Sequence, residues 1–277
     1  IDREVVKAIL IDLEIEIKNT TDNGLSLLVP PFRADVQREV DVIEEILRIY
    51  GFNTVAIPPK LNTTISYSDG VNPEKLRNTI SDLLSNNGFN EAMNNSLTKG
   101  KYTALIPEID SALNVEILNP LSQDLNVMRQ TLKFAGLENV AYNQNRKNSD
   151  IKFYEFGKTY HKYNDAYQED KHLTLFITGE RAKESWSLPS KTSDFFYAKG
   201  VITAVLARLG IDTLKTTPSK QDVFSEGITL GLGKMKLVEF GVIKSSLLKE
   251  FGIKQEVLFA DFNWDTILKI TGNKNVK

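Results

Sequence analysis

A succession of strand-like segments, interrupted by few helices, is the feature of this sequence that most constrains its fold. The segments lie at residues 115–118, 127–132, 151–161, 172–178, 228–232, 236–243 and 257–263. Helices are expected at residues 133–145, 194–209 and 245–251, and Ser193 is expected to cap the second of them. Because strands outnumber helices and several follow one another directly, the pattern predicts an α+β fold with a largely antiparallel sheet.

The first 60 residues have a different order of elements. Asp2 suits the N-cap of a helix that ends near Leu13. Two strands are expected at residues 14–18 and 25–29, joined by a turn cluster that ends in Asn-Gly, which is a hairpin signal. A second helix is expected at residues 39–50, ended by Gly51. The order helix, hairpin, helix has the size of a helix-turn-helix or winged-helix module.

Polar residues and turn formers separate this part from the strand-rich part. The segment from Pro58 to Gly70 has Pro-Pro at one end and Ser-Asp-Gly at the other. After it, Asn72-Pro73 begins a helix that is expected to end near Asn86, with proline in its first position. We therefore predict a first domain at residues 1–60, a linker at 61–71 and a second domain at 72–277.

The composition excludes several classes of function. The 277 residues carry a formal net charge of −2, so a nucleic-acid contact over the whole surface is not expected. Without cysteine there is no thiolate metal site, catalytic cysteine or disulfide. No apolar run approaches the roughly 18 residues that span a bilayer, and the N-terminal stretch does not resemble a signal peptide. We expect a cytoplasmic location and no membrane partner, and Ile1 as the first residue suggests a piece of a longer chain.

The helix expected at residues 39–50 carries the clearest candidate site. At about 100° per residue, one side of it is apolar, with Val40, Ile43, Ile46, Leu47 and Tyr50. Asp41, Glu44 and Glu45 fall on the opposite side, and Asp35 lies just before the helix. Carboxylate oxygens with open positions beside them suit Mg²⁺. Acidic residues in the first turns of a helix also favour its dipole, so the periodicity alone favours a solvated face over a metal site.

Other candidate sites are weaker. His161 and His172 lie on expected strands, and a structural or surface role is favoured for both. The segment Gly231-Leu232-Gly233-Lys234 lacks the spacing of a phosphate-binding loop and predicts a hairpin turn instead. The basic stretch at residues 145–148 ends a helix, where cations suit the dipole. A solvated loop is favoured there, with an RNA or partner contact as the alternative.

The stretch VPPFRADVQREVDVIEEILRIYGFN, at residues 29–53, resembles the signature of bacterial-type phenylalanyl-tRNA synthetase beta chains. Later segments resemble segments of this family in the same order. They are NPLS at 119–122 followed by Met128-Arg129, FYEFGK at 153–158, DFFYAKG at 194–200 and VEFGVI at 238–243. Val238 stands where the family usually has glycine. The resemblance extends over nearly the whole chain and identifies it as a central fragment of such a beta chain.

The resemblance implies a metal site and partners. In this family the beta chain offers four carboxylates to a Mg²⁺ ion that it shares with the alpha chain, and the matching positions here are Asp35, Asp41, Glu44 and Glu45. The implied partners are the alpha chain and tRNA, in an α2β2 enzyme that uses ATP to attach phenylalanine to its tRNA. The implied fold is a partial helix-turn-helix-like module followed by a class II synthetase-like domain.

That second domain is expected to lack catalytic residues. Class II synthetases bind ATP through an F-R-x-E strand and a G-x-G-x-x-x-R helix. The segment Phe153-Tyr154-Glu155 has no arginine, and Lys236 and Leu237 stand where one is expected after Gly231. Without these guanidiniums, the phosphate charge that develops during adenylation would not be neutralised. We therefore expect no catalytic and no cofactor-binding residue on this chain apart from the Mg²⁺ carboxylates.

Two alternatives remain from the sequence. One is a nucleic-acid-binding module of helix-turn-helix type, which the acidic helix face and the net charge of −2 disfavour. The other is a small synthetase-like enzyme that needs no partner, which the missing arginines disfavour.

Overall fold

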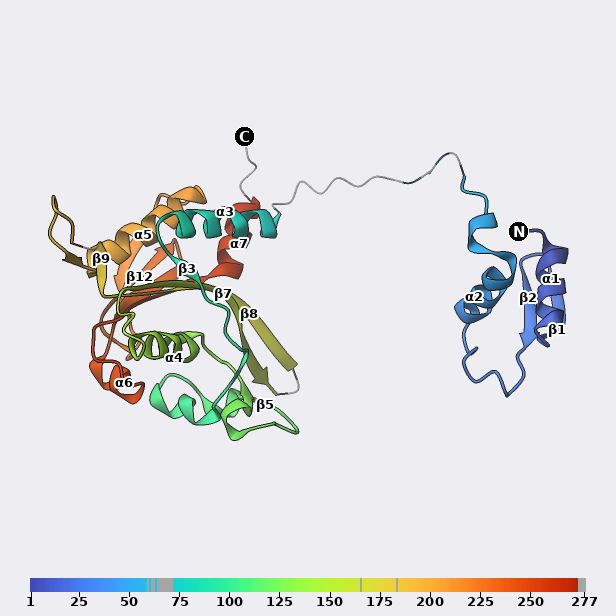
Figure 1. Ribbon diagram of the computed structural model, residues 1–277, viewed down its shortest axis with the longest axis horizontal. Helices are drawn as coiled ribbons and strands as arrows, with labels where there is room; N and C mark the ends of the chain where they lie inside the picture. The colour runs from blue at the N-terminus through green and yellow to red at the C-terminus, as the bar shows by residue number, and fades with distance from the viewer. Residues whose placement is uncertain (59, 61–62, 64–71, 165, 183, 274–277) are drawn as a thin grey trace. The chain divides into compact units, whose positions relative to one another are not determined.

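The computed structural model describes residues 1–58, 60, 63, 72–164, 166–182 and 184–273. They form two compact units, one within Ile1–Ser68 and one within Asp69–Lys277. Each unit has its own apolar core, and Figure 1 labels the helices and strands of each. The linker predicted at residues 61–71 lies outside the described residues, apart from Thr63.

The first unit contains two helices and a hairpin. In chain order its elements are α1 (Arg3–Asp12), β1 (Glu16–Thr21), β2 (Gly24–Leu28), α2 (Glu39–Tyr50) and the 3-10 helix η1 (Phe52–Thr54). The predicted order of elements is confirmed, and the carboxylate of Asp2 caps α1 by accepting a hydrogen bond from the backbone N–H of Glu4. Strand β1 continues to Thr21, beyond its predicted end at residue 18. Because the hairpin separates the two helices, the comparison with a helix-turn-helix stays a prediction.

A seven-stranded sheet forms the centre of the second unit, in the order β11-β12-β13-β14-β8-β7-β3. Its strands are β3 (Asn90–Glu91), β7 (Ile151–Tyr163), β8 (Ala166–Thr178), β11 (Lys215–Pro218), β12 (Phe224–Leu232), β13 (Met235–Ile243) and β14 (Leu258–Asn263). All neighbouring pairs are antiparallel except β3 and β7, which are parallel. The largely antiparallel sheet predicted from the sequence is therefore confirmed.

Short strands and 3-10 helices lie outside this sheet. Strands β4 (Leu97–Thr98), β5 (Val115–Glu116) and β6 (Val127–Met128) form a small sheet, and β9 (Glu180–Ala182) pairs with β10 (Lys191–Thr192). The 3-10 helices are η2 (Gly100–Leu105), η3 (Ser111–Leu113) and η4 (Gln123–Leu125). The strands predicted at residues 115–118 and 127–132 are shorter than expected, because only two residues of each form ladder pairs.

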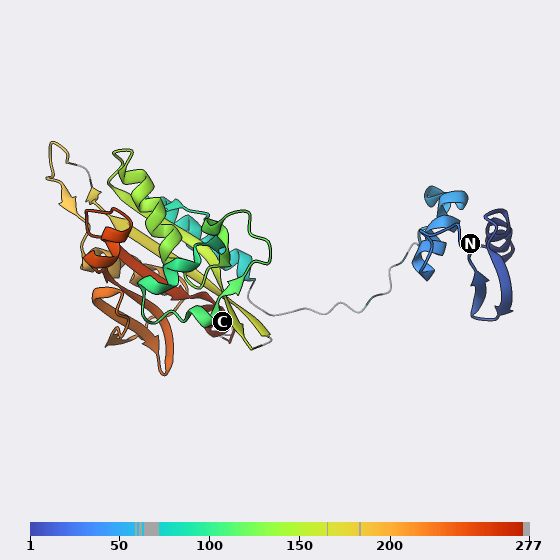
Figure 2. The same cartoon turned by 90° about the horizontal axis from the view of Figure 1, so that it is seen from below.

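Helices cover both faces of the large sheet (Figures 1 and 2). Helices α3 (Pro73–Asn86), α5 (Phe195–Arg208) and α7 (Trp264–Asn273) pack on one face, which we call the α5 face. Helices α4 (Lys133–Gln144) and α6 (Ser245–Glu250) pack on the other, the α4 face, against Phe176 and Phe259. Among the described residues, no helix is long and apolar enough to span a membrane.

Two details of the helices differ from the sequence prediction. The cap of α5 is Asp194, whose carboxylate accepts a hydrogen bond from the backbone N–H of Tyr197 at 2.7 Å. The predicted cap, Ser193, is buried one position earlier, and its hydroxyl has no partner among the described residues. Helix α7 was not predicted. It begins directly after β14, so no loop or turn signal separates the strand from the helix.

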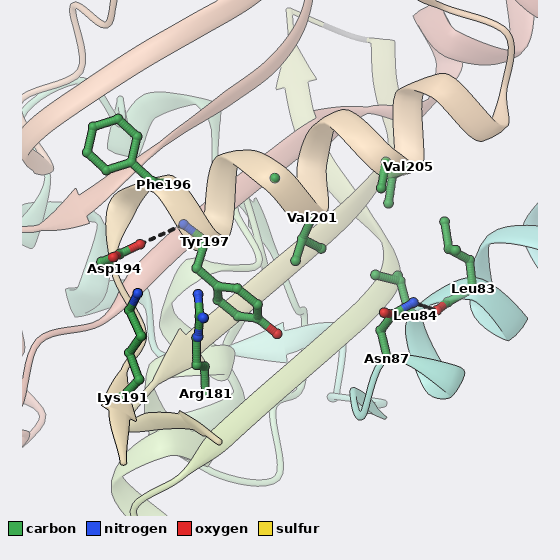
Figure 3. A pocket seen from close by; sticks show the side chains of 12 residues that line it. Leu83, Leu84, Asn87, Arg181, Lys191, Asp194, Phe196, Tyr197, Val201 and Val205 are labelled. Carbon is green, nitrogen blue, oxygen red and sulfur yellow. Dashed lines mark hydrogen bonds between the residues drawn. The ribbon is translucent and has the colours of Figure 1, made fainter. Parts of the chain in front are cut away.

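The packing of α3 beside α5 leaves a cavity of about 490 Å³ that also touches the β9–β10 hairpin (Figure 3).

Candidate functional site

The four carboxylates predicted to bind Mg²⁺ lie at the start of α2 and just before it. Asp41 caps this helix, because its Oδ2 accepts hydrogen bonds from the backbone N–H groups of Arg38 at 2.8 Å and Gln37 at 3.1 Å. Its Oδ1 accepts a further bond from Nη2 of Arg38 at 2.9 Å. These three bonds, led by that from the Arg38 guanidinium, lower the pKa of Asp41 to about 2. Both oxygens of Asp41 therefore serve the helix N-terminus.

Glu45 is held between two arginines. Its Oε2 lies 2.7 Å from Nη2 of Arg33 and 2.6 Å from Nη2 of Arg48. Hydrogen bonds from Arg48 and then Arg33 lower the pKa of Glu45. Asp35 is more exposed, and its Oδ1 lies 3.6 Å from Nε of the same Arg33. Arg33 thus joins the segment before α2 to the second turn of that helix.

Glu44 is exposed and has no ion pair or hydrogen bond with any described residue. The set therefore divides into two carboxylates that stabilise the local fold, Asp41 and Glu45, and two that face solvent, Asp35 and Glu44. Within the described part of the chain, no three acidic or histidine side chains lie close enough to hold a metal ion. These residues do not by themselves fit a resident Mg²⁺ ion, because both oxygens of Asp41 are held by Arg38 and backbone N–H groups and two arginines hold Oε2 of Glu45.

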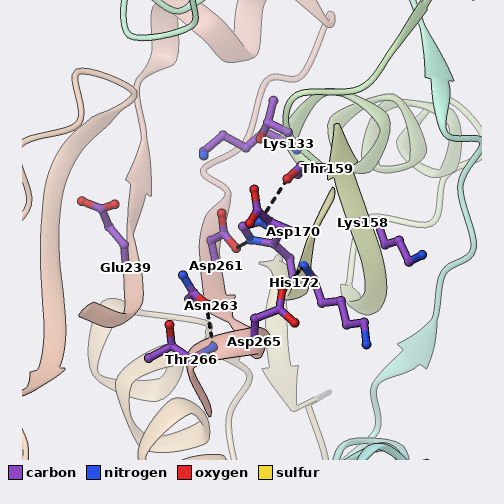
Figure 4. A network of polar contacts seen from close by, with 12 residues as sticks. Lys133, Lys158, Thr159, Asp170, His172, Glu239, Asp261, Asn263, Asp265 and Thr266 are labelled. Atoms are coloured by element: carbon purple, nitrogen blue, oxygen red, sulfur yellow. Dashed lines mark hydrogen bonds and ion pairs between the residues drawn. The ribbon is translucent and has the colours of Figure 1, made fainter. Parts of the chain in front are cut away.

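A second polar cluster lies on the α4 face of the large sheet (Figure 4). His172 on β8 and Asp261 on β14 form a hydrogen-bonded ion pair, with 2.7 Å between Nδ1 and Oδ1. The other ring nitrogen, Nε2, lies 3.2 Å from the hydroxyl of Thr159 on β7. Burial lowers the pKa of His172, but the charge and hydrogen bond of Asp261 outweigh it, so the pKa is raised above 6.5. This arrangement agrees with the structural or surface role favoured for His172.

Lys133 closes one side of this cluster. It is buried at the start of α4, and its Nζ lies 5.0 Å from the centre of the Phe259 ring. Burial lowers its pKa, against the opposing charges of Asp261 and Glu239. Its ammonium has no hydrogen bond or ion pair with a described residue. The lysine is therefore buried beside the Phe259 ring without an ion pair to a described residue.

The rest of the α4 face is filled by side chains of the chain itself. Arg129 and Glu155 form a buried ion pair, with 2.7 Å between Nη1 and Oε1 and only 5% and 3% of their side chains exposed. A Cβ on Gly136 of α4 would lie 2.0 Å from the Phe176 ring, so the helix backbone rests directly on the sheet. A Cβ on Gly241 would likewise lie 2.8 Å from the Phe224 ring. These contacts leave little room for a nucleotide on this face.

The remaining sequence predictions fall on surface features. Gly233 lies in the tight turn between β12 and β13 with φ of 60°, which confirms the hairpin turn. The basic stretch at residues 145–148 follows α4 and is exposed, and the Arg146 guanidinium lies 3.4 Å from the centre of the Tyr142 ring. This placement agrees with the favoured solvated loop.

Sequence reasoning missed two features. The ion pair of Arg129 with Glu155 was not predicted, although Arg129 lies in a segment quoted for the family resemblance. The cavity between α3 and α5 was not predicted either, since its lining comes from segments 100 residues apart in the chain. The one sequence signal in this region was the segment DFFYAKG, at residues 194–200, which begins α5 and was quoted for the family resemblance.

Comparison with known families gives matches over both units. The model of the phenylalanyl-tRNA synthetase beta chain CLM domain matches residues 57–264, which is most of the chain. This chain belongs to the phenylalanyl-tRNA synthetase beta chain family. The model of the tRNA synthetase B5 domain matches residues 1–52, which form the first unit.

Curated relatives agree with this family. The phenylalanine–tRNA ligase beta subunit of Bacteroides thetaiotaomicron is 43% identical over 96% of this chain and 34% of its own length. That of Porphyromonas gingivalis is 38% identical over 97% of this chain and 34% of its own length. The chain thus spans about a third of the length of the relatives it matches, and the family resemblance drawn from the sequence is confirmed.

A solved structure shows a similar fold at low identity. The pyrrolysyl-tRNA synthetase of Desulfitobacterium hafniense superposes with a TM-score of 0.58 at 13% identity, covering 97% of this chain and 89% of that one. At this identity the likeness concerns the fold alone. It agrees with the synthetase-like, antiparallel-sheet domain expected from the sequence.

Proposed function

We propose that this chain is the central part of a phenylalanine–tRNA ligase beta chain and acts as a non-catalytic scaffold that docks the alpha chain. In this proposal the assembled α2β2 enzyme uses ATP to attach phenylalanine to its tRNA in the cytoplasm. The adenylation step takes place on the alpha chain. The family membership supports the identity of the enzyme, and the packing of the α4 face supports the non-catalytic role.

The cations of the α4 face carry this proposal. A triphosphate needs unpaired guanidinium or ammonium groups that can bind its oxygens. Arg129 is paired with Glu155 inside the protein, and Lys236 is paired with Glu239. Lys133 is buried beneath the cluster of Figure 4. Two of these cations are thus paired and the third is buried, which disfavours binding of a transferring phosphate on this face.

The test is phenylalanine-dependent ATP–pyrophosphate exchange. The chain alone is expected to give no exchange above background, at any phenylalanine concentration. Added alpha chain is expected to form a larger species with it in size-exclusion chromatography. Exchange by the chain alone would contradict the non-catalytic role and favour the self-sufficient enzyme. Failure to bind the alpha chain would contradict the scaffold role.

We also propose that the acidic residues before and within α2 contribute to a Mg²⁺ site that the alpha chain completes. The exposed carboxylates of Asp35 and Glu44 support this, because they have free oxygens and Mg²⁺ accepts ligands from more than one chain while keeping waters. Asp41 and Glu45 would then mainly hold the helix and Arg33 in position.

The structure sharpens the choice of variants for this site. Substitution of Asp41 or Glu45 would also disturb the helix cap or the arginine contacts, so Asp35→Asn and Glu44→Gln are the cleaner pair. Each is expected to raise the magnesium concentration that the assembled enzyme needs for half-maximal activity, with the fold of the chain unchanged by circular dichroism. Glu39→Gln, at the exposed first position of the same helix, is the matched control. An unchanged magnesium requirement in the double variant would remove the site from the proposal.

A helix-turn-helix-like role for the first unit is the alternative function. Its two helices and hairpin support the comparison, but the acidic residues of α2 would repel phosphates. Gel shifts of duplex DNA with the whole chain at two salt concentrations separate the possibilities. We expect no shift at nanomolar protein, and a salt-dependent shift at that concentration would favour the alternative.

A further inference from the structure

The cavity between α3 and α5 has no part in the function proposed above. Its volume of about 490 Å³ lies in the range of roughly 300–1,000 Å³ that is typical of small-ligand sites. Figure 3 shows its three walls, which are the C-terminal end of α3, one side of α5 and the β9–β10 hairpin. The two helices pack on the large sheet, so the inner part of the cavity is built on rigid elements.

The inner part of the cavity is apolar. Leu83 and Leu84 contribute from α3, and Val201, Ala204 and Val205 contribute from α5. Gly200 also lines the cavity but is exposed, and a Cβ built there would have no atom within 4 Å, so this turn of α5 leaves an open recess at the edge of the cavity. An aromatic ring or a branched aliphatic group could lie against Leu84 and Val205 and extend to this recess, where its burial would be favourable.

The mouth of the cavity is positively charged. Arg181 and Lys191 line it from β9 and β10, and their nitrogen ends lie beside the first turn of α5 (Figure 3). Neither forms an ion pair with a residue that the structure describes. Asp194 is the carboxylate among the lining residues, and its Oδ1 already accepts the backbone N–H of Tyr197. Two cations and one carboxylate among the lining residues, with Lys152 close to the Tyr197 ring, make the mouth positively charged.

The ring of Tyr197 connects the two parts. The guanidinium carbon of Arg181 lies 5.8 Å from the ring centre, and Nζ of Lys152 lies 5.3 Å from it. These cation–π distances place the cations where the apolar wall begins. A ligand with a charge at one end and an apolar group at the other would therefore match the cavity along its length.

We infer that this cavity binds a small molecule that joins one carboxylate to an aromatic or branched apolar group. The carboxylate would lie between Arg181 and Lys191, and the apolar group would lie between α3 and α5. Asp194 lies among the same lining residues, and its carboxylate would repel a doubly charged phosphate more strongly than a monoanion. The inference is independent of docking to the alpha chain and of the Mg²⁺ site.

The first test is calorimetric titration of the 277-residue chain with 3-phenylpropionate at low ionic strength. Its neutral analogue 3-phenylpropanol and its cationic analogue 2-phenylethylamine are titrated in parallel. The carboxylate is expected to bind at least tenfold more tightly than the alcohol, and the amine is expected not to bind. Arg181→Gln and Lys191→Gln are each expected to weaken carboxylate binding at least fivefold. Arg208→Gln, on an exposed residue at the other end of α5, is the control and should leave binding unchanged.

A second pair of variants tests the location of the apolar group. Gly200→Phe should fill the recess and abolish binding, while Gly200→Ala should retain it. Circular dichroism melts establish that both variants are folded, which the open space around Gly200 allows. Equal binding of carboxylate and alcohol, or undiminished binding to Gly200→Phe, would overturn the inference. So would the absence of carboxylate binding together with capture of an acidic, apolar peptide, which would assign the cavity to a protein partner.

Discussion

At the N-terminus of α2, the carboxylate of Asp41 accepts two contacts from Arg38, a hydrogen bond from its backbone N–H at 2.8 Å and an ion pair with its guanidinium at 2.9 Å. The Asp41 carboxylate thus accepts hydrogen bonds from backbone N–H groups that have no partner within the helix. The pKa of Asp41 consequently falls from 3.8 to about 2. A helix cap and a candidate metal ligand are thus the same residue, and the cap is the role that its contacts define.

The first prediction concerns this cap. A depressed carboxylate pKa contributes stability above pH 3.8 that is lost as the pH falls toward 2. Asp41→Asn should therefore speed hydrogen exchange of the α2 amides at neutral pH and should flatten the acid dependence of that exchange between pH 4 and pH 2. Glu44→Gln, on the exposed side of the same helix, should leave both unchanged. An acid dependence in Asp41→Asn equal to that of the unaltered chain would contradict this assignment.

The second prediction is that the stability of the second unit falls as the pH rises, because the ion pair of His172 with Asp261 is lost. Because the folded-state pKa of His172 lies above 6.5, the pair contributes stability below pH 6.5 that is lost as the pH rises through the raised value. His172→Gln should lower the urea midpoint at pH 6 and remove its decline toward pH 8.5. Titration of the imidazole by NMR provides an independent measurement of the same pKa.

His161 is the natural comparison, since burial lowers its pKa below 6.5. Its folded form resists protonation, so it should reduce stability as the pH falls below 6.5, which is the opposite trend. In His161→Gln the free energy of unfolding should therefore fall less as the pH drops below 6.5. Its pH dependence above 6.5 should be unaltered. Identical pH profiles for the two variants would refute the assignment.

Removal of one partner from the buried ion pair of Arg129 with Glu155 should strongly lower the free energy of unfolding. Arg129→Met leaves a carboxylate that is only 3% exposed without its cation, and such a loss typically costs about 3–5 kcal/mol of unfolding free energy. The double variant Arg129→Met with Glu155→Met should cost less than the sum of the single changes. The exposed pair of Lys158 with Glu169 is the control, and Lys158→Gln should change the urea midpoint little. Additive effects in the buried pair would mean that the two residues do not interact.

Two glycines inside helices should respond in opposite directions to the same substitution. Gly136→Ala forces a methyl group into the Phe176 ring, and such overpacking typically costs about 1–3 kcal/mol. Gly200→Ala meets only open space, so the helix propensity of alanine should stabilise the chain by up to about 1 kcal/mol. Thermal melts of the two variants measure the difference. A stabilising Gly136→Ala would contradict the close packing of α4 on the sheet.

Local signals were sufficient for much of the secondary structure. The bounds of α2 follow from its apolar periodicity and from Gly51, whose φ of 92° suits the residue after a helix. Helix α3 begins after Asn72, as its cap and Pro73 indicate. Strands β3, β4, β9, β10 and β11 and helix α7 were missed, because they are short or adjoin another element without a turn signal. The cap of α5 was placed one residue early, at Ser193, since two neighbouring residues could each accept the same hydrogen bond.

The sequence by itself determined the family, the order of elements in the first unit and the identity of the four candidate carboxylates, because periodicity, caps and motif spacing act between residues close together in the chain. Only the tertiary structure decided what those and other polar groups contact. Arg33 reaches Glu45 across a turn, and Arg129 reaches Glu155 from 26 positions away. Such pairs depend on which strands are neighbours and which faces helices cover, and no local pattern encodes those distances.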